Sequence, residues 1–262
     1  MIPVSVIITS YNQKEYLKKA IDSVFKQTVV PEEIIICDDY STDGSREMLK
    51  EYEEKYDNIK LILQNKNVGV AKNRNSGLKY ASSPFVSILD GDDFYSENKL
   101  ESEYNAIKDT NYGWAYSEAY QGSKKNDFDQ VVINEDNGKT GDMFFELLTK
   151  EVSPKHWMMR KEVLEDIGYI DEDLELQEDW ELKIRLSHDY EAVFCSDSYI
   201  FYRNHRGGLH YSSDFEKQKQ KRKIYNKILN KKIDQLTRVR ENKKKVRKIL
   251  QRDFLTVSGF NE

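Results

Sequence analysis

The sequence is poor in the residues that crosslink, interrupt or anchor a chain. It has two cysteines, four prolines and twelve glycines in 262 residues, so neither a disulfide scaffold nor a long disordered linker is indicated. Cys37 and Cys195 each lie in a run typical of a buried strand, which favours reduced core thiols, with one disulfide as the alternative. The start has no basic segment, and apolar runs such as residues 4–8 are too short to span a bilayer. We expect a cytoplasmic protein without a signal peptide or a helical anchor of its own.

Two common phosphate-binding motifs are also missing. The chain contains no G-x-x-x-x-G-K-S/T and no G-x-G-x-x-G, which disfavours P-loop NTPases and Rossmann dehydrogenases. Lys and Arg total 41 against 46 Asp and Glu, a net charge of -5, and this balance predicts no nucleic-acid partner. The 38% hydrophobic and 12% aromatic residues are enough for a packed core.

Residues 1–100 alternate short β-branched runs with longer amphipathic segments. We expect strands at residues 4–9, 33–37, 60–64 and 85–89, and helices at residues 15–27, 45–56 and 70–80. Parallel strands need crossover connections, and right-handed crossovers place helices on the sheet faces. The predicted fold class is therefore α/β, with a Rossmann-like, mostly parallel sheet flanked by helices.

Polar residues follow each predicted strand, at the edge where such sheets bind ligands. Asp90, Asp92 and Asp93 place three carboxylates directly after an apolar strand. Their mutual repulsion is costly unless a cation or hydrogen bonds offset it. A divalent ion such as Mg²⁺ or Mn²⁺ is the natural partner, since it prefers oxygen ligands and is completed by water and substrate phosphate. The alternative is a solvated acidic turn, or Asp92 capping a helix that starts near Ser96.

Further candidates lie after the other strands. Asp38 and Asp39 end the second strand, where a carboxylate can accept from a nucleobase N–H or a ribose hydroxyl, although a turn is the alternative. Tyr11 can stack on a base or pack at the rim. Lys72 and Arg74 could face phosphate from the following helix, with surface solvation as the alternative.

Five ordered segments of the chain resemble the family 2 glycosyltransferases of GT-A fold, which are inverting enzymes that use nucleotide-sugar donors. The resemblance covers about residues 1–205, and its segments are VSVIITSYN at 4–12, IIICDDYSTDG at 34–44, NVGVAKNRN at 67–75, DGDD at 90–93 and QEDWEL at 177–182.

The resemblance implies roles for residues on the donor side. Thr9, Tyr11 and Asp39 would contact the nucleotide base, which is most often uridine in this family. Asp90 would approach the ribose and the donor sugar, and Asp92 would hold the metal on the diphosphate. The implied cofactor is Mn²⁺ or Mg²⁺, with a UDP-sugar as the donor substrate.

The resemblance also implies a catalytic pair. Asp179 matches the position of the family's catalytic base, and Glu178 would support the acceptor site. An inverting transfer needs one carboxylate to remove the acceptor proton while charge grows on the departing diphosphate. The alternative for both acids is the first turn of a helix, where carboxylates complement the helix dipole.

Later residues carry weaker parts of the pattern. His205 is a candidate third metal ligand, and Arg203 or Arg206 a candidate phosphate contact. The hydroxyl residues expected after this histidine are absent, and a solvent-exposed loop histidine is the alternative. His156 and Trp157 fall where family members line the acceptor pocket, with core packing as the alternative for Trp157.

The end of the chain is strongly basic. Residues 214–252 hold 16 Lys or Arg against 4 Asp or Glu, a local charge of +12. Apolar residues recur there at helical spacing. We expect a catalytic domain at residues 1–210 and a basic amphipathic helical tail at 211–262. The tail could pack on the domain, form a homo-oligomer, or make a peripheral contact with anionic lipid at the inner face of the membrane.

The predicted function is a metal-dependent inverting glycosyltransferase of the hexosyl or N-acetylhexosaminyl type. It would move a sugar from a nucleoside-diphosphate donor, expected to be a UDP-sugar, to a hydroxyl of a glycan, glycolipid or glycoprotein. Lipid-linked and protein-linked glycans are the expected acceptor partners. The alternative is a non-catalytic nucleotide-sugar-binding protein, which the basic tail recruits to an anionic membrane or polymer.

Overall fold

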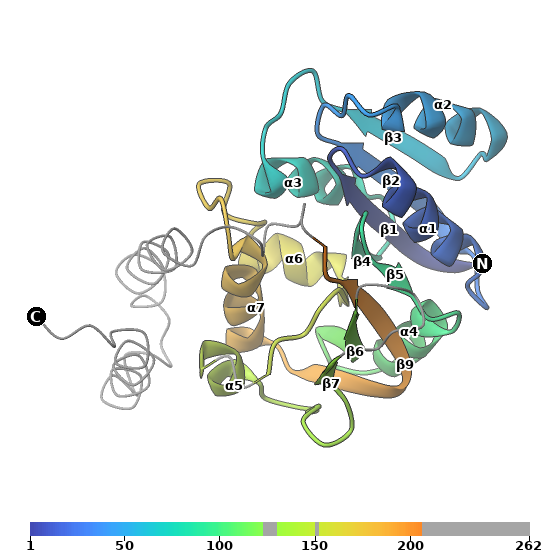
Figure 1. The fold of residues 1–262 in the computed structure, drawn as a ribbon. Coiled ribbons are helices and arrows are strands. Elements are labelled where there is room, and N and C mark those ends of the chain that lie inside the picture. Colours follow the sequence, from blue (N-terminus) through green and yellow to red (C-terminus); the bar gives the residue numbers. More distant parts are fainter. Residues whose placement is uncertain (123–129, 150–151, 206–262) are drawn as a thin grey trace, which may run out of the picture.

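The computed structural model describes residues 1–122, 130–149 and 152–205. Within these residues the chain forms one mixed sheet in the order β3-β2-β1-β4-β8-β6-β9-β5, with β7 paired to β6 (Figure 1). The strands and helices predicted for residues 1–100 are confirmed. Their bounds are β1 (Ile2–Ser10), α1 (Lys14–Phe25), β2 (Pro31–Asp38), α2 (Ser45–Lys55), β3 (Ile59–Leu63), α3 (Val70–Tyr80) and β4 (Phe85–Asp90).

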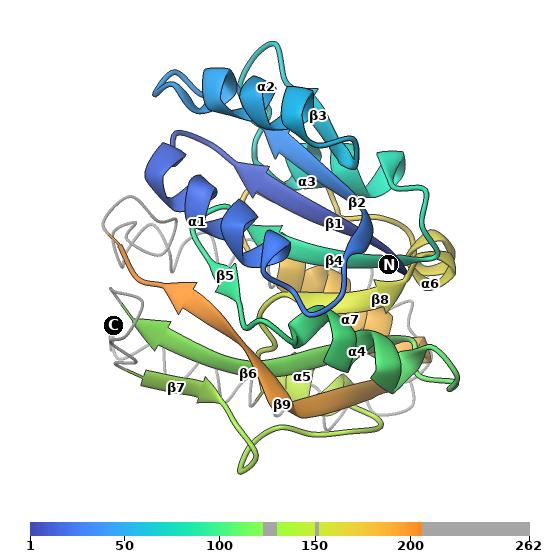
Figure 2. The same cartoon turned by 90° about the vertical axis from the view of Figure 1, so that its right-hand side faces the viewer.

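The parallel part of the sheet forms the core of this region. β1 lies between β2 and β4, and Ile7 pairs in register with Ile35 on one side and Ile88 on the other. All three side chains are at most 1% exposed, as expected for parallel strands covered on both faces. Helices α1 and α2 lie on one face and α3 on the other (Figure 2). Because β1, β2 and β4 are parallel neighbours, the polar residues at their carboxyl ends lie together at one end of the strands.

Helix α3 packs unusually close to the sheet. A Cβ added at Gly77 would lie 2.6 Å from Ile7 Cγ2 and 2.7 Å from Cys37 Sγ, nearer than packed carbon atoms approach. Only glycine allows this approach. The close packing buries the polar side chains of Asn73 and Arg74, which are 2% and 4% exposed.

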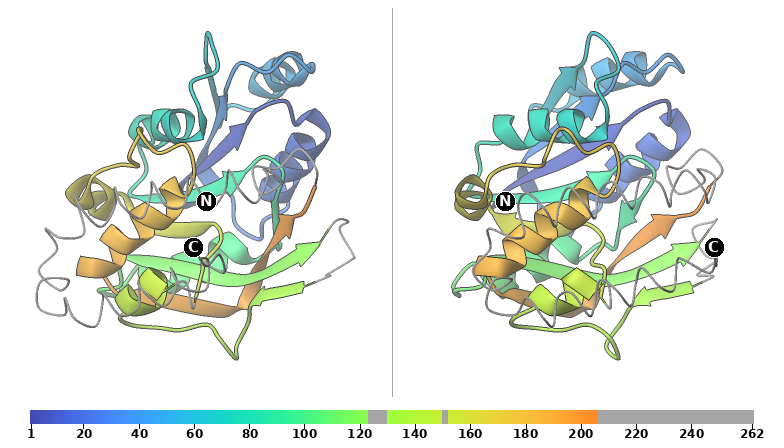
Figure 3. Two further views of the ribbon diagram at one scale, coloured as in Figure 1. Left: turned by 60° about the vertical axis from the view of Figure 1, so that its left-hand side comes forward. Right: turned by 90° about the vertical axis from the view of Figure 1, so that its left-hand side faces the viewer.

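The remaining elements extend the sheet with antiparallel and parallel pairs. β8 runs antiparallel to β4 and to β6, whereas β6 and β9 run parallel. Helix α7 lies on the same side of the sheet as α3 (Figure 3). The bounds are β5 (Phe94–Tyr95), α4 (Lys99–Ile107), β6 (Trp114–Gly122), β7 (Gln130–Ile133), α5 (Phe144–Thr149), β8 (Trp157–Arg160), α6 (Lys161–Ile167), α7 (Glu178–Asp189) and β9 (Ala192–Arg203).

Several expectations can be compared with this fold. Cys37 and Cys195 are both buried free thiols, as the reduced-core interpretation predicted. Among the described residues, no helix is both long and apolar enough to cross a bilayer. The boundary between residues 210 and 211, the basic tail and Arg206 all lie outside the described residues.

Candidate active site

A cavity of about 890 Å³ opens at the carboxyl ends of β1, β2 and β4. The start of α3, the loop before β8, the segment that leads into α7 and the end of β9 also line it. Nearly all the residues that the sequence singled out line it. They are Thr9, Tyr11, Asp39, Arg74, Asp90, Asp92, His156, Trp157, Glu178, Asp179, Arg203 and His205.

Arg74 joins two carboxylates from distant parts of the chain. Its Nη2 donates to Asp90 Oδ1 at 2.5 Å and its Nη1 to Glu178 Oε1 at 2.7 Å. Thr9 Oγ1 donates to the same Asp90 oxygen at 3.0 Å. Burial alone would raise the pKa of Asp90, but the Arg74 guanidinium holds it below its usual value. Arg74, which was expected to face phosphate, is therefore bonded to these two carboxylates instead.

Asp92 lies where a metal ligand was predicted. Its Oδ2 is 2.9 Å from His205 Nε2 and accepts from Gln13 Nε2 at 3.2 Å. The hydrogen bond with Asp92 raises the pKa of His205. Asp92 does not cap a helix, since α4 begins at Lys99. An oxygen and a nitrogen ligand thus lie together on the cavity wall.

Arg203 supports this loop from β9. Its Nε donates to the Asp92 carbonyl at 2.7 Å, and its backbone N–H donates to Asp93 Oδ1 at 2.7 Å. The guanidinium carbon lies 4.7 Å from the centre of the Tyr16 ring. Arg203 lines the cavity while it holds the backbone of the acidic loop in place.

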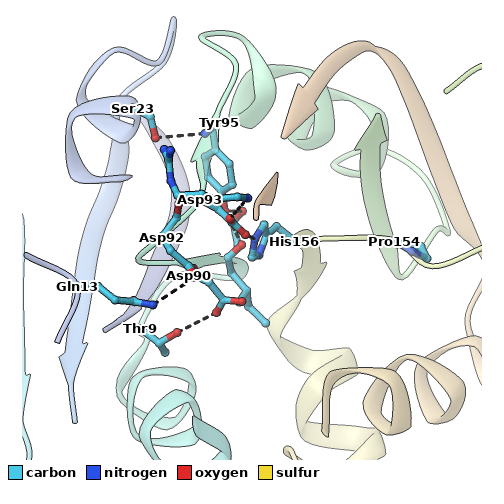
Figure 4. A network of polar contacts seen from close by, with 12 residues as sticks. Thr9, Gln13, Ser23, Asp90, Asp92, Asp93, Tyr95, Pro154 and His156 are labelled. Atoms are coloured by element: carbon cyan, nitrogen blue, oxygen red, sulfur yellow. Dashed lines mark hydrogen bonds and ion pairs between the residues drawn. The ribbon is translucent and has the colours of Figure 1, made fainter. Parts of the chain in front are cut away.

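Asp93 and His156 form a buried pair beside the predicted ligands (Figure 4). His156 Nε2 lies 2.5 Å from Asp93 Oδ2. Burial and the neighbouring Asp92 raise the pKa of Asp93 to about 7. Asp90, Asp93 and His156 each have a side-chain atom of a type that can bind a metal ion, and these three atoms lie within 4.8 Å of one another. The sequence suggested a role for His156 in the acceptor pocket but did not indicate its bond to the acidic loop.

The base-binding candidates have mixed surroundings. Tyr11 is 47% exposed at the cavity, so its ring is available for stacking. Asp39 is buried, and its two oxygens accept from the backbone N–H groups of Val68 and Gly69 at 2.7 and 2.9 Å. Lys72 is exposed and, unlike its neighbours on α3, is not among the residues that line the cavity.

Glu178 and Asp179 begin α7, as the helix-start interpretation predicted. Asp179 Oδ2 accepts from Lys183 Nζ at 2.8 Å. Burial would raise the pKa of Asp179, but Lys183 and Lys155 lower it well below its usual range. The two neighbouring acids also face the cavity, so they can meet a substrate as well as complement the helix dipole.

Lys183 and Gln13 are contacts that sequence reasoning missed. The spacing of Asp179 and Lys183 was a usable signal, because residues four apart share a helix face. Nothing in the sequence near Gln13 indicates that it reaches Asp92, 79 residues later.

The fold is an α/β sheet with a cavity lined by carboxylates at its strand ends, and comparison with known proteins identifies the family. The model of Glycosyl transferase family 2 matches residues 5–168, more than half of the chain. This protein therefore belongs to glycosyl transferase family 2.

One curated relative is the UDP-Glc:alpha-D-GlcNAc-diphosphoundecaprenol beta-1,3-glucosyltransferase WfgD of Escherichia coli. It is 38% identical over 113 residues, which are 43% of this chain and 44% of the relative. The match thus spans less than half of the relative's length.

Solved structures show the same fold at lower identity. Staphylococcus aureus TarS 1-349 in complex with UDP-GlcNAc has a TM-score of 0.68 and 23% identity, covering 81% of this chain and 61% of TarS. Mannosyltransferase PcManGT from Pyrobaculum calidifontis, in complex with GDP-Man and Mn²⁺, has a TM-score of 0.61 and 20% identity, covering 79% and 59%. These likenesses confirm the predicted GT-A-type α/β fold.

Proposed function

We propose that this protein is an inverting glycosyltransferase that moves a hexosyl or N-acetylhexosaminyl group from a UDP-sugar to an acceptor hydroxyl. The observation that carries the proposal is the content of one cavity. It contains the Asp179 carboxylate, whose surroundings favour its ionised form, and the Asp92 and His205 side chains, which contact each other. Such a site offers a base for a hydroxyl and ligands for a diphosphate-bound cation.

The donor binds along the ends of β1, β2 and β4 in this proposal. Tyr11 stacks on the uracil ring from its exposed position. Asp39 accepts from the base, because each carboxylate oxygen keeps a lone pair beyond its bond to Val68 or Gly69. Asp90, held by Thr9 and Arg74, approaches the ribose and sugar.

The predicted cation fits the side chains present. Asp92 and His205 supply an oxygen and a nitrogen ligand 2.9 Å apart on the cavity wall, a donor set that Mn²⁺ accepts readily and that Mg²⁺ accepts through its carboxylate and bound phosphate oxygens. When bound, either ion supplies Lewis-acid neutralisation of charge on the diphosphate. Arg203 holds the loop that carries Asp92, through the Asp92 carbonyl.

Asp179 acts as the general base in this proposal. It takes the proton of the acceptor hydroxyl as the oxygen forms its bond to the anomeric carbon. The bond from that carbon to the diphosphate breaks at the same time, and the nucleoside diphosphate leaves with the electron pair. Glu178 is held by Arg74 and helps to shape the acceptor side.

The acceptor is proposed to be a glycan, and a lipid-linked glycan is favoured over a protein-linked one. This preference rests on the activity of the relative WfgD, a glucosyltransferase that acts on alpha-D-GlcNAc-diphosphoundecaprenol. Contact with a membrane and self-association are assigned to the basic tail, which lies outside the described residues. Truncation after Ser213 should abolish binding to anionic liposomes and should reduce the assembly size measured by light scattering.

A screen of nucleotide-sugars tests the donor assignment. UDP-glucose, UDP-galactose, UDP-N-acetylglucosamine and GDP-mannose are each added with Mn²⁺, and the unfolding temperature is measured. A true donor stabilises the protein by mass action, so one UDP-sugar should raise that temperature. The same donor should then release UDP when glycan acceptors are added. Binding without release would favour the non-catalytic alternative, and no shift with any UDP-sugar would overturn the uridine assignment.

A further inference from the structure

A fully buried lysine lies behind the proposed base. Lys183, on α7, is 0% exposed, which is rare for lysine unless the ammonium is paired. Its Nζ donates to Asp179 Oδ2 and to the Pro154 carbonyl, both at 2.8 Å. Two fixed acceptors from different segments therefore hold this ammonium in one place.

Lys183 also connects the base to the acidic loop. Pro154 is followed by Lys155 and His156, and His156 contacts Asp93. His156 has a backbone φ of 42°, a left-handed conformation that is strained for this residue and needs support from its surroundings. The bond to the Pro154 carbonyl supplies such support two residues earlier. A continuous set of contacts thus runs from Asp179 through Lys183 to the loop that carries Asp92.

The charges around Glu178 and Asp179 separate their titrations. Burial raises the pKa of Glu178, although Arg74 opposes this. Among the groups that lower the pKa of Asp179, Lys183 has the largest effect and Lys155 the next largest. When surroundings push two neighbouring carboxyl groups apart in this way, the ionised one is suited to be the base.

The other charged or titratable groups that face Asp179 come from several elements. Arg74 faces it from α3, Glu178 from α7 itself, Lys155 from the segment before β8, and Tyr202 from β9. Arg74 already bridges Asp90 and Glu178. Lys155 lies 5.0 Å from the centre of the Tyr202 ring, and it acts on Asp179 through space. Among the described residues, Lys183 is thus the cation in direct contact with this carboxylate.

We propose that Lys183 is a positioning residue for the transfer reaction, which holds Asp179 ionised, directed into the cavity and tied to the Pro154–His156 segment. The Asp179 side chain is 33% exposed at the cavity whereas that of Lys183 is 1% exposed, so the lysine acts through Asp179 and does not touch substrate. This inference rests on the proposed function, because Asp179 is a base only within it.

A second buried pair provides a matched control. Lys99 and Glu103 on α4 are also four residues apart, with 2.6 Å between Nζ and Oε2 and both side chains 0% exposed. Neither residue lines the cavity. Loss of either lysine leaves a carboxylate without its cation, so Lys99→Met controls for the cost in stability. Only the Lys183 variants should alter the chemistry.

The experiment compares Lys183→Met, Lys183→Gln and Lys99→Met with the unmodified protein. UDP release is measured from UDP-glucose and UDP-N-acetylglucosamine with glycan acceptors, at a temperature where each variant is folded. We expect kcat to fall about 10- to 100-fold in both Lys183 variants, as a displaced catalytic group does. The Kd of UDP with Mn²⁺ should stay within about twofold, because the donor contacts are intact.

The pH profile separates positioning from a structural role. Loss of the Lys183 cation raises the pKa of Asp179, and the base must be ionised to act. The acid limb of kcat/KM should therefore move to higher pH in the Lys183 variants and stay in place in Lys99→Met. An unchanged kcat and acid limb in the Lys183 variants would overturn the proposal, as would an equal change in Lys99→Met.

A readout without turnover keeps this test apart from that of the proposed function. The ¹³C shift of the Asp179 carboxyl carbon, assigned with Asp179→Asn, is titrated in the unmodified protein and in Lys183→Gln. This variant keeps a donor for the Pro154 carbonyl and replaces Lys183→Met if the latter does not fold. The Asp179 pKa should rise in Lys183→Gln, and an unmoved titration contradicts our inference. Absence of UDP release from the unmodified protein would instead count against the proposed function.

Discussion

The two parts of the candidate site are assembled in different ways. In the N-terminal part, Thr9, Asp39 and Asp90 each lie at or directly after the end of a parallel strand, and these strands are neighbours in the sheet. In the C-terminal part, His156 and His205 reach the acidic loop from 63 and 113 residues away. The first part follows from a general rule for parallel sheets, whereas the second depends on individual long-range contacts.

The largest expected effect separates the two parts by function. Asp179→Asn should lower the rate of sugar transfer about 10²- to 10⁴-fold, the usual contribution of a general base, and should leave UDP binding unchanged. Asp92→Asn should weaken Mn²⁺-dependent UDP binding about tenfold or more. Calorimetric titration with UDP and Mn²⁺, run beside a UDP-release assay, measures both. Full transfer by both variants would show that the site is assigned incorrectly.

The next effect removes the strongest contact between the two parts. Arg74→Met leaves the buried Glu178 and the partly buried Asp90 without their shared cation. Breaking a buried ion pair on one side costs about 3–5 kcal/mol, so the free energy of unfolding in urea should fall by about that amount. A loss below about 1 kcal/mol would mean that this bridge contributes no more than a surface pair.

A smaller effect on the free energy of unfolding is expected at the amino ends of the parallel strands, opposite the cavity. Glu33, near the start of β2, accepts hydrogen bonds from Ser5, Ser82 and Ser83. Glu33→Gln should reduce the free energy of unfolding at pH 7 by about 1.5–3 kcal/mol, the value of a hydrogen bond to a charged group. UDP release should be unchanged, since Glu33 is remote from the cavity.

The same variant has a defined pH dependence. Burial alone would raise the pKa of Glu33, but the hydrogen bonds from Ser5 and Ser82 lower it below the ordinary 4.5. A lowered pKa in the folded state stabilises the protein above pH 4.5, and this stabilisation is lost as the pH falls through the folded value. The difference between the two proteins in urea unfolding should therefore shrink in acid. An equal difference at pH 7 and pH 3 would contradict this account.

The smallest effect comes from a second contact between the same parts. Lys79 on α3 pairs with Glu172 at 3.0 Å, but the two side chains are 54% and 38% exposed. Exposed pairs contribute about 0–1 kcal/mol, so Lys79→Met should stay within that range of the unmodified protein. This variant is the surface control for Arg74→Met, and a loss equal to that of Arg74→Met would remove the distinction between buried and exposed bridges.

Much of the N-terminal part could be predicted from the sequence. Apolar β-branched runs alternate with amphipathic segments, so the bounds of α3 agree with the expected residues 70–80. Asp90 and Asp92 follow directly after β4, and the rule for parallel strand ends places them at the cavity. These inferences needed only local periodicity and chain connectivity.

The environment of individual side chains was less predictable. Arg74 was expected to face phosphate or solvent, yet it is 4% exposed between two acids. One of those acids, Glu178, lies 104 residues later in the chain, so no pattern near Arg74 indicates it. Burial of Lys183 likewise depends on Pro154, which belongs to another segment. A charged side chain is buried only where the fold supplies its partners.

The features of this protein thus divide into those that depend on local sequence and those that depend on the tertiary structure. The sequence by itself determined the βα alternation, the polar ends of the strands and the family, because these depend on local pattern and order along the chain. Only the tertiary structure decided which acid meets which cation, since that depends on residues far apart being brought into one desolvated neighbourhood. Two such contacts lie in the candidate site: Asp179 with Lys183, and Asp92 with His205.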